Sequence, residues 1–202
     1  MIDVYVEAGS RRCLAMAYDW PGWGRQAKTP EEAVARLDDY RARYRRIAER
    51  AGVELGEESL DSVEVIEGNA TTDFGAPGTV HPRDHRAPIT VTHHLALWRA
   101  GWESFDECAE RAPEALAKGP RGGGRSRSAI VDHVFETERA YAPKIGVRPG
   151  TLNSLELRDA LVSRAEELIL SPAEVKWPLA FLIRRSAWHA VDHLWEIEDR
   201  SR

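Results

Sequence analysis

The chain has 202 residues, of which 43% are hydrophobic and 30% are charged, and its formal net charge is −5. This is the composition of an ordinary globular protein with room for one large or two small domains, and the acidic balance disfavours a general affinity for nucleic acid. No apolar run approaches the ~20 residues that span a bilayer, and residues 1–7 lack the basic-then-apolar order of a secretion signal, so we expect a cytoplasmic protein without a membrane partner.

The first 68 residues predict a small α/β domain. Alternating apolar residues indicate strands, Pro and Gly indicate loops, and a Thr-Pro-Glu-Glu capping sequence precedes a helix of period 3.6. The predicted elements are strands over 3–7, 12–18 and 62–67, a loop over 19–25, and a helix over 31–51 that stops at Gly52. This order resembles the small α/β domain of HicB-like antitoxins over about residues 1–68. The resemblance implies a fold, and we do not extend it to antitoxin function.

The helix predicted over 31–51 is rich in arginine. Such a run is typical of a solvated helix face, and the alternative is a contact with a polyanion. Nucleic-acid or toxin binding by the N-terminal domain would depend on these residues and would be steeply salt-dependent. Because the chain is acidic overall, we expect no such binding. The residues concerned are Arg36, Arg41, Arg43, Arg45, Arg46 and Arg50.

Residues 69–88 form the longest stretch without periodicity. Such a segment in a compact protein is either a linker or a functional loop. In the second case its polar residues would fold over a site in the domain that follows. We therefore name Asn69 and Thr71 as candidate substrate-binding residues, with a plain linker as the alternative.

From residue 89 to residue 202 the apolar pattern predicts four helices with short breaks. Four such helices favour a four-helix bundle that builds its site from facing side chains. The fold class predicted is therefore α+β, with a small α/β domain followed by a bundle. The helices are predicted from Thr90 to near Pro113, from near Ser126 to Tyr141, from Thr151 or Asn153 to Ser171, and from Pro178 almost to the C-terminus.

A connection rich in glycine and basic residues precedes the second of these helices. Residues 118–128 join four cations to a triple glycine. Backbone N–H groups at a helix start, together with nearby arginines, attract carboxylate or phosphate, and His133 follows ~10 Å along the axis at 1.5 Å per residue. Arg121 and Arg125 are therefore candidate substrate-binding residues; the alternative is a mobile, solvated loop.

The last helix carries His189 and His193, four residues apart. This spacing places two imidazoles on one helix face, close enough to share a divalent ion. Both lie at the edge of the apolar stripe, so the pair faces a groove between helices. The alternative is a pair of helix-edge histidines bound to neighbouring carboxylates, because a zinc-like site needs at least three protein ligands.

His133, at the margin of the apolar stripe of the second helix, is the best candidate for a third ligand. Three histidines from two helices, with one position left for water, are the layout of a catalytic metal site. Glu196 and Arg185 lie on the histidine side of the last helix. Glu196 is a candidate general base or a carboxylate that orients a ligand, with a surface pair to Arg200 as the alternative. Arg185 is a candidate substrate-binding residue.

A lone His followed about two helices later by His-x-x-x-His resembles the DinB-like superfamily of four-helix bundles, over roughly residues 88–200. That group includes metal-dependent enzymes that use low-molecular-weight thiols, among them thiol transferases and a maleylpyruvate isomerase. The resemblance implies that His133, His189 and His193 hold a divalent ion and that a small thiol serves as co-substrate. It does not define the reaction, because one fold hosts many functions.

The leading functional prediction is a metal-dependent enzyme that acts on a small, anionic molecule by thiol transfer, isomerisation or hydrolysis. Zinc suits three imidazoles best, and nickel or iron(II) would also fit. The alternative is a metal- or ligand-binding protein without turnover, and the third hypothesis is the nucleic-acid or toxin binding described above. A homodimer is compatible with the sequence, which does not specify the oligomeric state.

Overall fold

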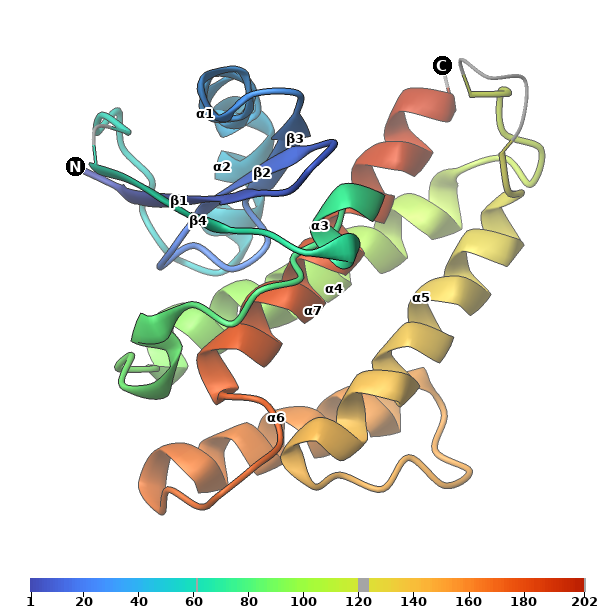
Figure 1. The fold of residues 1–202 in the computed structure, drawn as a ribbon. Coiled ribbons are helices and arrows are strands. Elements are labelled where there is room, and N and C mark those ends of the chain that lie inside the picture. The colour runs from blue at the N-terminus through green and yellow to red at the C-terminus, as the bar shows by residue number, and fades with distance from the viewer. Residues whose placement is uncertain (61, 120–123, 202) are drawn as a thin grey trace.

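The computed structural model describes residues 1–60, 62–119 and 124–201. In these residues seven α-helices accompany one four-stranded sheet (Figure 1). The α+β class predicted from the sequence is therefore confirmed at this level. In the same residues no helix combines the length and the apolar character needed to cross a membrane.

The sheet has the strand order β3-β2-β1-β4. Strands β1 and β2 form an antiparallel hairpin, and β4 returns to pair in parallel with β1, which requires the crossover that the intervening helices supply. Three strands were predicted; β3 was not, because it is a four-residue edge strand within and after the predicted Pro-Gly loop. The strands are Asp3–Ala8 (β1), Cys13–Ala17 (β2), Gly24–Ala27 (β3) and Ser62–Glu67 (β4).

The predicted single helix over 31–51 is two helices, α1 (Pro30–Asp39) and α2 (Arg41–Arg50). Thr29 caps α1 by accepting a hydrogen bond from the Glu32 N–H, as the capping sequence predicted. The backbone leaves helical geometry at Tyr40, where φ is −91° and ψ is 1°. The Tyr40 ring lies 4.9 Å from the Trp195 ring, so the break coincides with a tertiary contact that periodicity cannot reveal.

Residues 69–88 contain helix α3 (Ala70–Phe74) and a 3-10 turn over Pro82–His85. This segment is held to the last helix, because buried Asp84 accepts two hydrogen bonds from the buried guanidinium of Arg184. One apolar core extends from the sheet into the helices that follow. The division into domains at residues 68 and 88 stays a prediction.

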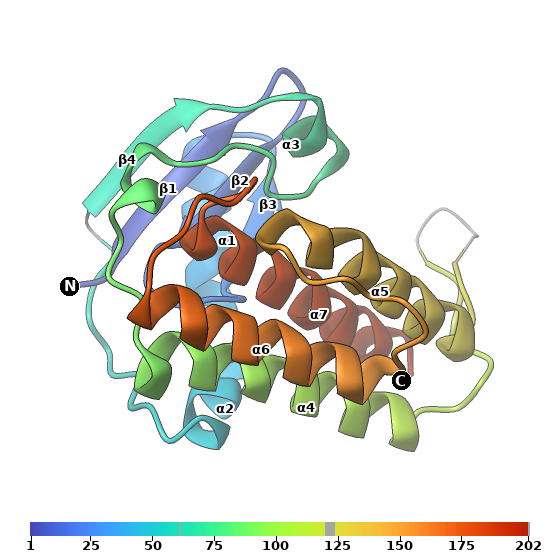
Figure 2. The ribbon, with the colours of Figure 1, turned by 90° about the horizontal axis from the view of Figure 1, so that it is seen from below.

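The four long helices follow the sequence closely, and Figure 2 shows them lying alongside one another beneath the sheet. A π-helical turn, Val91–Leu95, precedes the first of them. The second begins near Ser126, as predicted, with Ser126 as its cap, and of the two residues proposed for the third, Asn153 is the cap. Pro178 is the N-cap of the fourth rather than its first residue. The helices are Ala96–Arg111 (α4), Arg127–Tyr141 (α5), Ser154–Leu170 (α6) and Leu179–Arg200 (α7).

Helix α7 lies between the sheet and the other long helices. On one side its Trp188 joins an apolar cluster with the sheet residues Tyr5 and Met16. On another side its Ser186 hydroxyl accepts a hydrogen bond of 3.0 Å from the Trp98 indole of α4. Because α7 is buried against both layers, its histidines have a fixed backbone frame.

Candidate metal centre

Three imidazoles from two helices meet in the space between α5 and α7. One potential ligand atom from each of His133, His189 and His193 lies within 4.8 Å of the others. The Nε2 atoms of His133 and His189 are 3.2 Å apart. Two nitrogens that share a tetrahedral zinc at about 2.0–2.1 Å stand roughly 3.3 Å apart. The spacing of this pair is thus compatible with two ligands on one ion, and it is also that of an N–H···N hydrogen bond between two neutral imidazoles.

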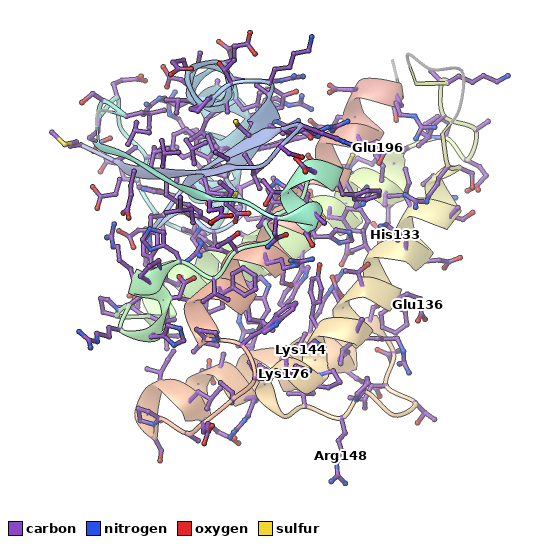
Figure 3. The ribbon with its side chains drawn as sticks, viewed as in Figure 1. His133, Glu136, Lys144, Arg148, Lys176 and Glu196 are labelled. Atoms are coloured by element: carbon purple, nitrogen blue, oxygen red, sulfur yellow. The ribbon has the colours of Figure 1, made fainter. Side chains whose placement is uncertain are left out.

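Helix α5 is fixed near His133 by a buried ion pair. Arg158 of α6 binds both oxygens of Glu138, five residues beyond His133, with distances of 2.9 and 3.1 Å. Neighbouring Ile130 and Val134 are fully buried. The main chain that carries His133 is therefore held against α6 and the core, while its imidazole turns toward α7. Figure 3 shows His133 on α5 and Glu196 on α7.

The two histidines that contact each other directly have depressed pKa values. Burial lowers the pKa of His189 to about 2, and the neighbouring His193, His133, Arg185 and Arg125 act in the same direction. Burial and the His193 charge also lower the pKa of His133. Both rings are consequently neutral at physiological pH, which is the protonation state that binds metal. His133 and His189 are partly exposed, so solvent reaches the cluster.

Glu196 orients the third imidazole. Its Oε2 accepts a hydrogen bond of 2.7 Å from His193 Nδ1, and its Oε1 accepts one of 2.6 Å from Arg200. Its pKa is lowered chiefly by the His193 hydrogen bond, so it is ionised near neutral pH. Because Nδ1 is engaged by Glu196, Nε2 is the nitrogen of His193 that could bind a metal ion. The carboxylate has both partners that the sequence had offered as alternatives, and its role as a general base stays a prediction.

Arg185 lies one turn before His189, within a group of aromatic rings. Its Nε donates to the Tyr141 hydroxyl at 3.0 Å, and its Nη1 donates to the Pro77 carbonyl. Its guanidinium carbon is 5.3 Å from the centroids of the Tyr141 and Trp177 rings. The Tyr141 ring is in turn 6.4 Å from the His189 ring. A positive charge is thus held beside the cluster, while its role in substrate binding stays a prediction.

Sequence reasoning did not identify Tyr141 and Trp177 as neighbours of the site. Tyr141 ends α5, and Trp177 lies in the connection before α7, so neither belongs to a pattern centred on His189. One signal was present, because Phe181, Arg185 and His189 recur at intervals of four on α7. Phe181 also packs against Trp177, with ring centroids 5.1 Å apart.

The remaining predicted binding residues lie in different settings. The Arg125 side chain is exposed, and its charge lowers the pKa of both His133 and His189. Its backbone carbonyl accepts a hydrogen bond from Arg200. Arg121 lies outside the described residues. Asn69 caps α3, accepting from the Thr71 N–H at 2.8 Å and donating to the Gly78 carbonyl at 2.8 Å. These hydrogen bonds shape α3, and the assignment of Asn69 and Thr71 to substrate binding stays a prediction.

Charged residues outside the cluster are largely paired. Asp192, which lies between His189 and His193 in sequence, points away from the cluster and forms an ion pair of 2.8 Å with Arg25 of β3. Several arginines of α2 form ion pairs with carboxylates, some of them at the exposed surface. These pairs are Arg41 with Asp38, Arg43 with Glu198 and Asp199, Arg45 with Glu57, and Arg50 with Glu103 and Glu107.

The sequence matches no protein-family model, and no curated protein or solved structure shows a significant match to it. The histidine cluster is therefore the feature of the chain that points most directly to a function.

Proposed function

We propose that this chain is a divalent-metal enzyme whose ion is held by His133, His189 and His193. The observation that carries the proposal is the 3.2 Å separation of the His133 and His189 Nε2 atoms across two helices. The packing of α5 on α7 brings these residues together, and without an ion the two neutral rings can share one N–H···N hydrogen bond at this distance. A shared ion gives that contact a favourable energy, because both lone pairs then face a positive charge.

The donor set fits the proposed group. Three neutral imidazoles are the ligands of several catalytic zinc sites, and they also accept nickel or iron(II). The low pKa values of His189 and His133 keep their lone pairs available. A hydrogen bond from His193 Nδ1 to a carboxylate is the usual partner of a metal-binding imidazole. Three protein ligands leave a fourth position for an exogenous group.

When bound, such an ion lowers the pKa of coordinated water or of a coordinated thiol and so supplies a nucleophile near neutral pH. The chain's own residues would select and orient the substrate. Arg185 and Arg125 place positive charge next to the cluster, which favours a small anionic molecule. Tyr141 and Trp177 hold the Arg185 guanidinium in place. Thiol transfer, isomerisation and hydrolysis all suit this arrangement, and the DinB-like resemblance favours the first two, with a low-molecular-weight thiol as co-substrate.

Metal content tests the proposal directly. Purified protein should hold about one zinc, nickel or iron(II) ion per chain at a three-histidine site, measured by elemental analysis after dialysis. His189→Ala should lose the ion. His85→Ala, an exposed histidine outside the cluster, should keep it and serves as the matched control. Full occupancy in His189→Ala would show that the ligands are wrongly assigned.

Ligand exchange separates an enzyme from a protein that only binds metal. The cobalt(II)-substituted protein should change its visible absorption when imidazole or cysteine is added, because an open position accepts an exogenous ligand. A spectrum that is unaffected by either additive would indicate a saturated site and would favour the alternative of metal binding without turnover.

A further inference from the structure

Arg200, in the last turn of α7, connects the histidine cluster to the chain between α4 and α5. All three nitrogens of its guanidinium are engaged. Nη1 donates to Glu196 Oε1 at 2.6 Å, Nε donates to the Ala117 carbonyl at 2.8 Å, and Nη2 donates to the Arg125 carbonyl at 2.7 Å. The Ala117 N–H in turn donates to the Arg200 carbonyl at 2.8 Å. The residue therefore binds α7 to residues 117 and 125 at once.

The same carboxylate that Arg200 holds also orients His193. Glu196 has one oxygen on Arg200 and the other on His193 Nδ1. An exposed Glu–Arg pair four residues apart would fix little by itself, because it is worth only about 0.2–0.5 kcal/mol. Here the guanidinium is restrained by two carbonyls as well, so the orientation of the carboxylate is set from outside α7. Because its Nδ1 is hydrogen-bonded to that carboxylate, the His193 ring is oriented with it.

We propose that Arg200 is a positioning residue of the metal site and that the Ala117 and Arg125 carbonyls, which hold its guanidinium, support metal affinity through it. This inference rests on the proposed function. With Arg200 in place, Glu196 holds the His193 ring through Nδ1, with its centroid 5.0 Å from that of His133 and 4.7 Å from that of His189. Loss of the contacts with the Ala117 and Arg125 carbonyls would release the Arg200 guanidinium, and with it the Glu196 carboxylate that orients His193.

Gly124 provides a way to disturb this contact without touching α7. Its φ is +146°, a value that side-chain-bearing residues rarely adopt, and a Cβ added there would overlap the Arg200 guanidinium. Since the overlapping atoms are the far end of a flexible side chain, Gly124→Ala should displace the guanidinium rather than disrupt the helix. The substitution lies outside the histidine cluster and its carboxylate.

The experiment compares Arg200→Gln, Gly124→Ala and the double variant. Zinc affinity is measured by competition with a chromophoric chelator, and the melting temperature of the metal-free protein reports folding separately. Each single variant should weaken zinc binding about 10-fold, the lower end of the range for outer partners of metal ligands. Both substitutions disrupt the same contact, so their effects should not add. The double variant should bind zinc about as tightly as the single variant with the lower affinity.

Arg43→Gln is the matched control, because Arg43 binds Glu198 and Asp199 in the same turns of α7 without contacting Glu196. It should keep wild-type zinc affinity even if the metal-free protein melts earlier. Wild-type affinity in Arg200→Gln, with loss in His189→Ala, would overturn this inference and leave the metal site intact. Additive losses in the double variant would overturn the route through Arg200. Absence of zinc binding by the wild-type chain would instead remove the proposed function.

Discussion

Arg25 of β3 and Asp192 of α7 form an ion pair of 2.8 Å, with side chains that are 10% and 29% exposed. Asp192 lies between His189 and His193 in sequence but on a different face of the helix. The Arg25 guanidinium also lies 4.1 Å from the Tyr40 ring centroid and 5.0 Å from that of Trp195. The pair therefore fixes the edge of the sheet to the helix that carries two of the candidate ligands.

Asp192→Asn should lower the free energy of unfolding by about 1–3 kcal/mol, because it leaves a largely buried guanidinium without its counter-charge. Urea denaturation of the metal-free protein measures this loss. Zinc affinity should not change, since the carboxylate points away from the cluster. Weakened zinc binding together with unchanged stability would place Asp192 in the metal site.

Substitution of Glu196 should affect metal binding more than folding. Glu196→Ala removes the acceptor of the His193 Nδ1–H and should reduce zinc affinity by about 10- to 100-fold. Glu196→Gln keeps an acceptor but loses the charge, so its affinity should lie between those of the wild type and Glu196→Ala. Chelator competition gives the order of the three, and Glu198→Gln, on the Arg43 side of the helix, serves as the control. Equal affinities would show that the carboxylate does not orient the ligand.

The sequence predicts the parts of the site that depend on local rules. The spacing of His189 and His193 is a property of one helix. Ser126 and Asn153 cap their helices through backbone N–H groups three residues ahead, so both starts could be located. His133 could be predicted as the third ligand because it lies at the margin of the apolar stripe of a second helix, where its side chain faces the neighbouring helices.

The remaining features depend on contacts between segments that are far apart in the chain. Strand β3 exists because Gly24 and its neighbours pair with β2, and its sequence has no alternation of its own. The break at Tyr40 accompanies a contact with Trp195. The binding of Arg200 to the Ala117 and Arg125 carbonyls joins backbone groups that carry no side-chain signal. Periodicity describes one element at a time, so it could not predict these three features.

Removal of only one partner of the buried ion pair between α5 and α6 should strongly destabilise the protein, because the other partner stays buried. Arg158 binds Glu138, which is 2% exposed, and Asp106 at 2.7 Å. Arg158→Leu should lower the free energy of unfolding by about 3–5 kcal/mol, because it leaves a buried carboxyl group unpaired. Denaturation in guanidinium chloride measures the loss.

A second substitution separates this charge effect from a packing effect. Adding Glu138→Leu to Arg158→Leu should restore much of the stability, since an apolar pair of similar size often replaces a buried ion pair without cost. Arg111→Leu, at a side chain that is 80% exposed, should change stability by less than about 0.5 kcal/mol. A double variant as unstable as Arg158→Leu would show that packing, rather than charge, dominates here.

Glu7 of β1 should make the protein less stable as the pH rises. Its side chain is fully buried, Oε2 accepts hydrogen bonds from Thr72, Gly78 and Thr79, and Oε1 has no partner among the described residues. Burial raises its pKa, despite these hydrogen bonds. A carboxyl group whose folded pKa exceeds its unfolded pKa, about 4.3, does not destabilise the fold at a pH below the unfolded pKa. It destabilises the fold as the pH rises through the folded pKa.

Glu7→Gln should therefore melt about 2–4 °C higher than the wild type at pH 8 and at the same temperature as the wild type at pH 4. Differential scanning fluorimetry measures both melting temperatures. Glu67→Gln, an exposed residue of β4, should show no such pH-dependent difference, and a Glu7→Gln protein that melts earlier at pH 8 would mean that the fold requires the anion.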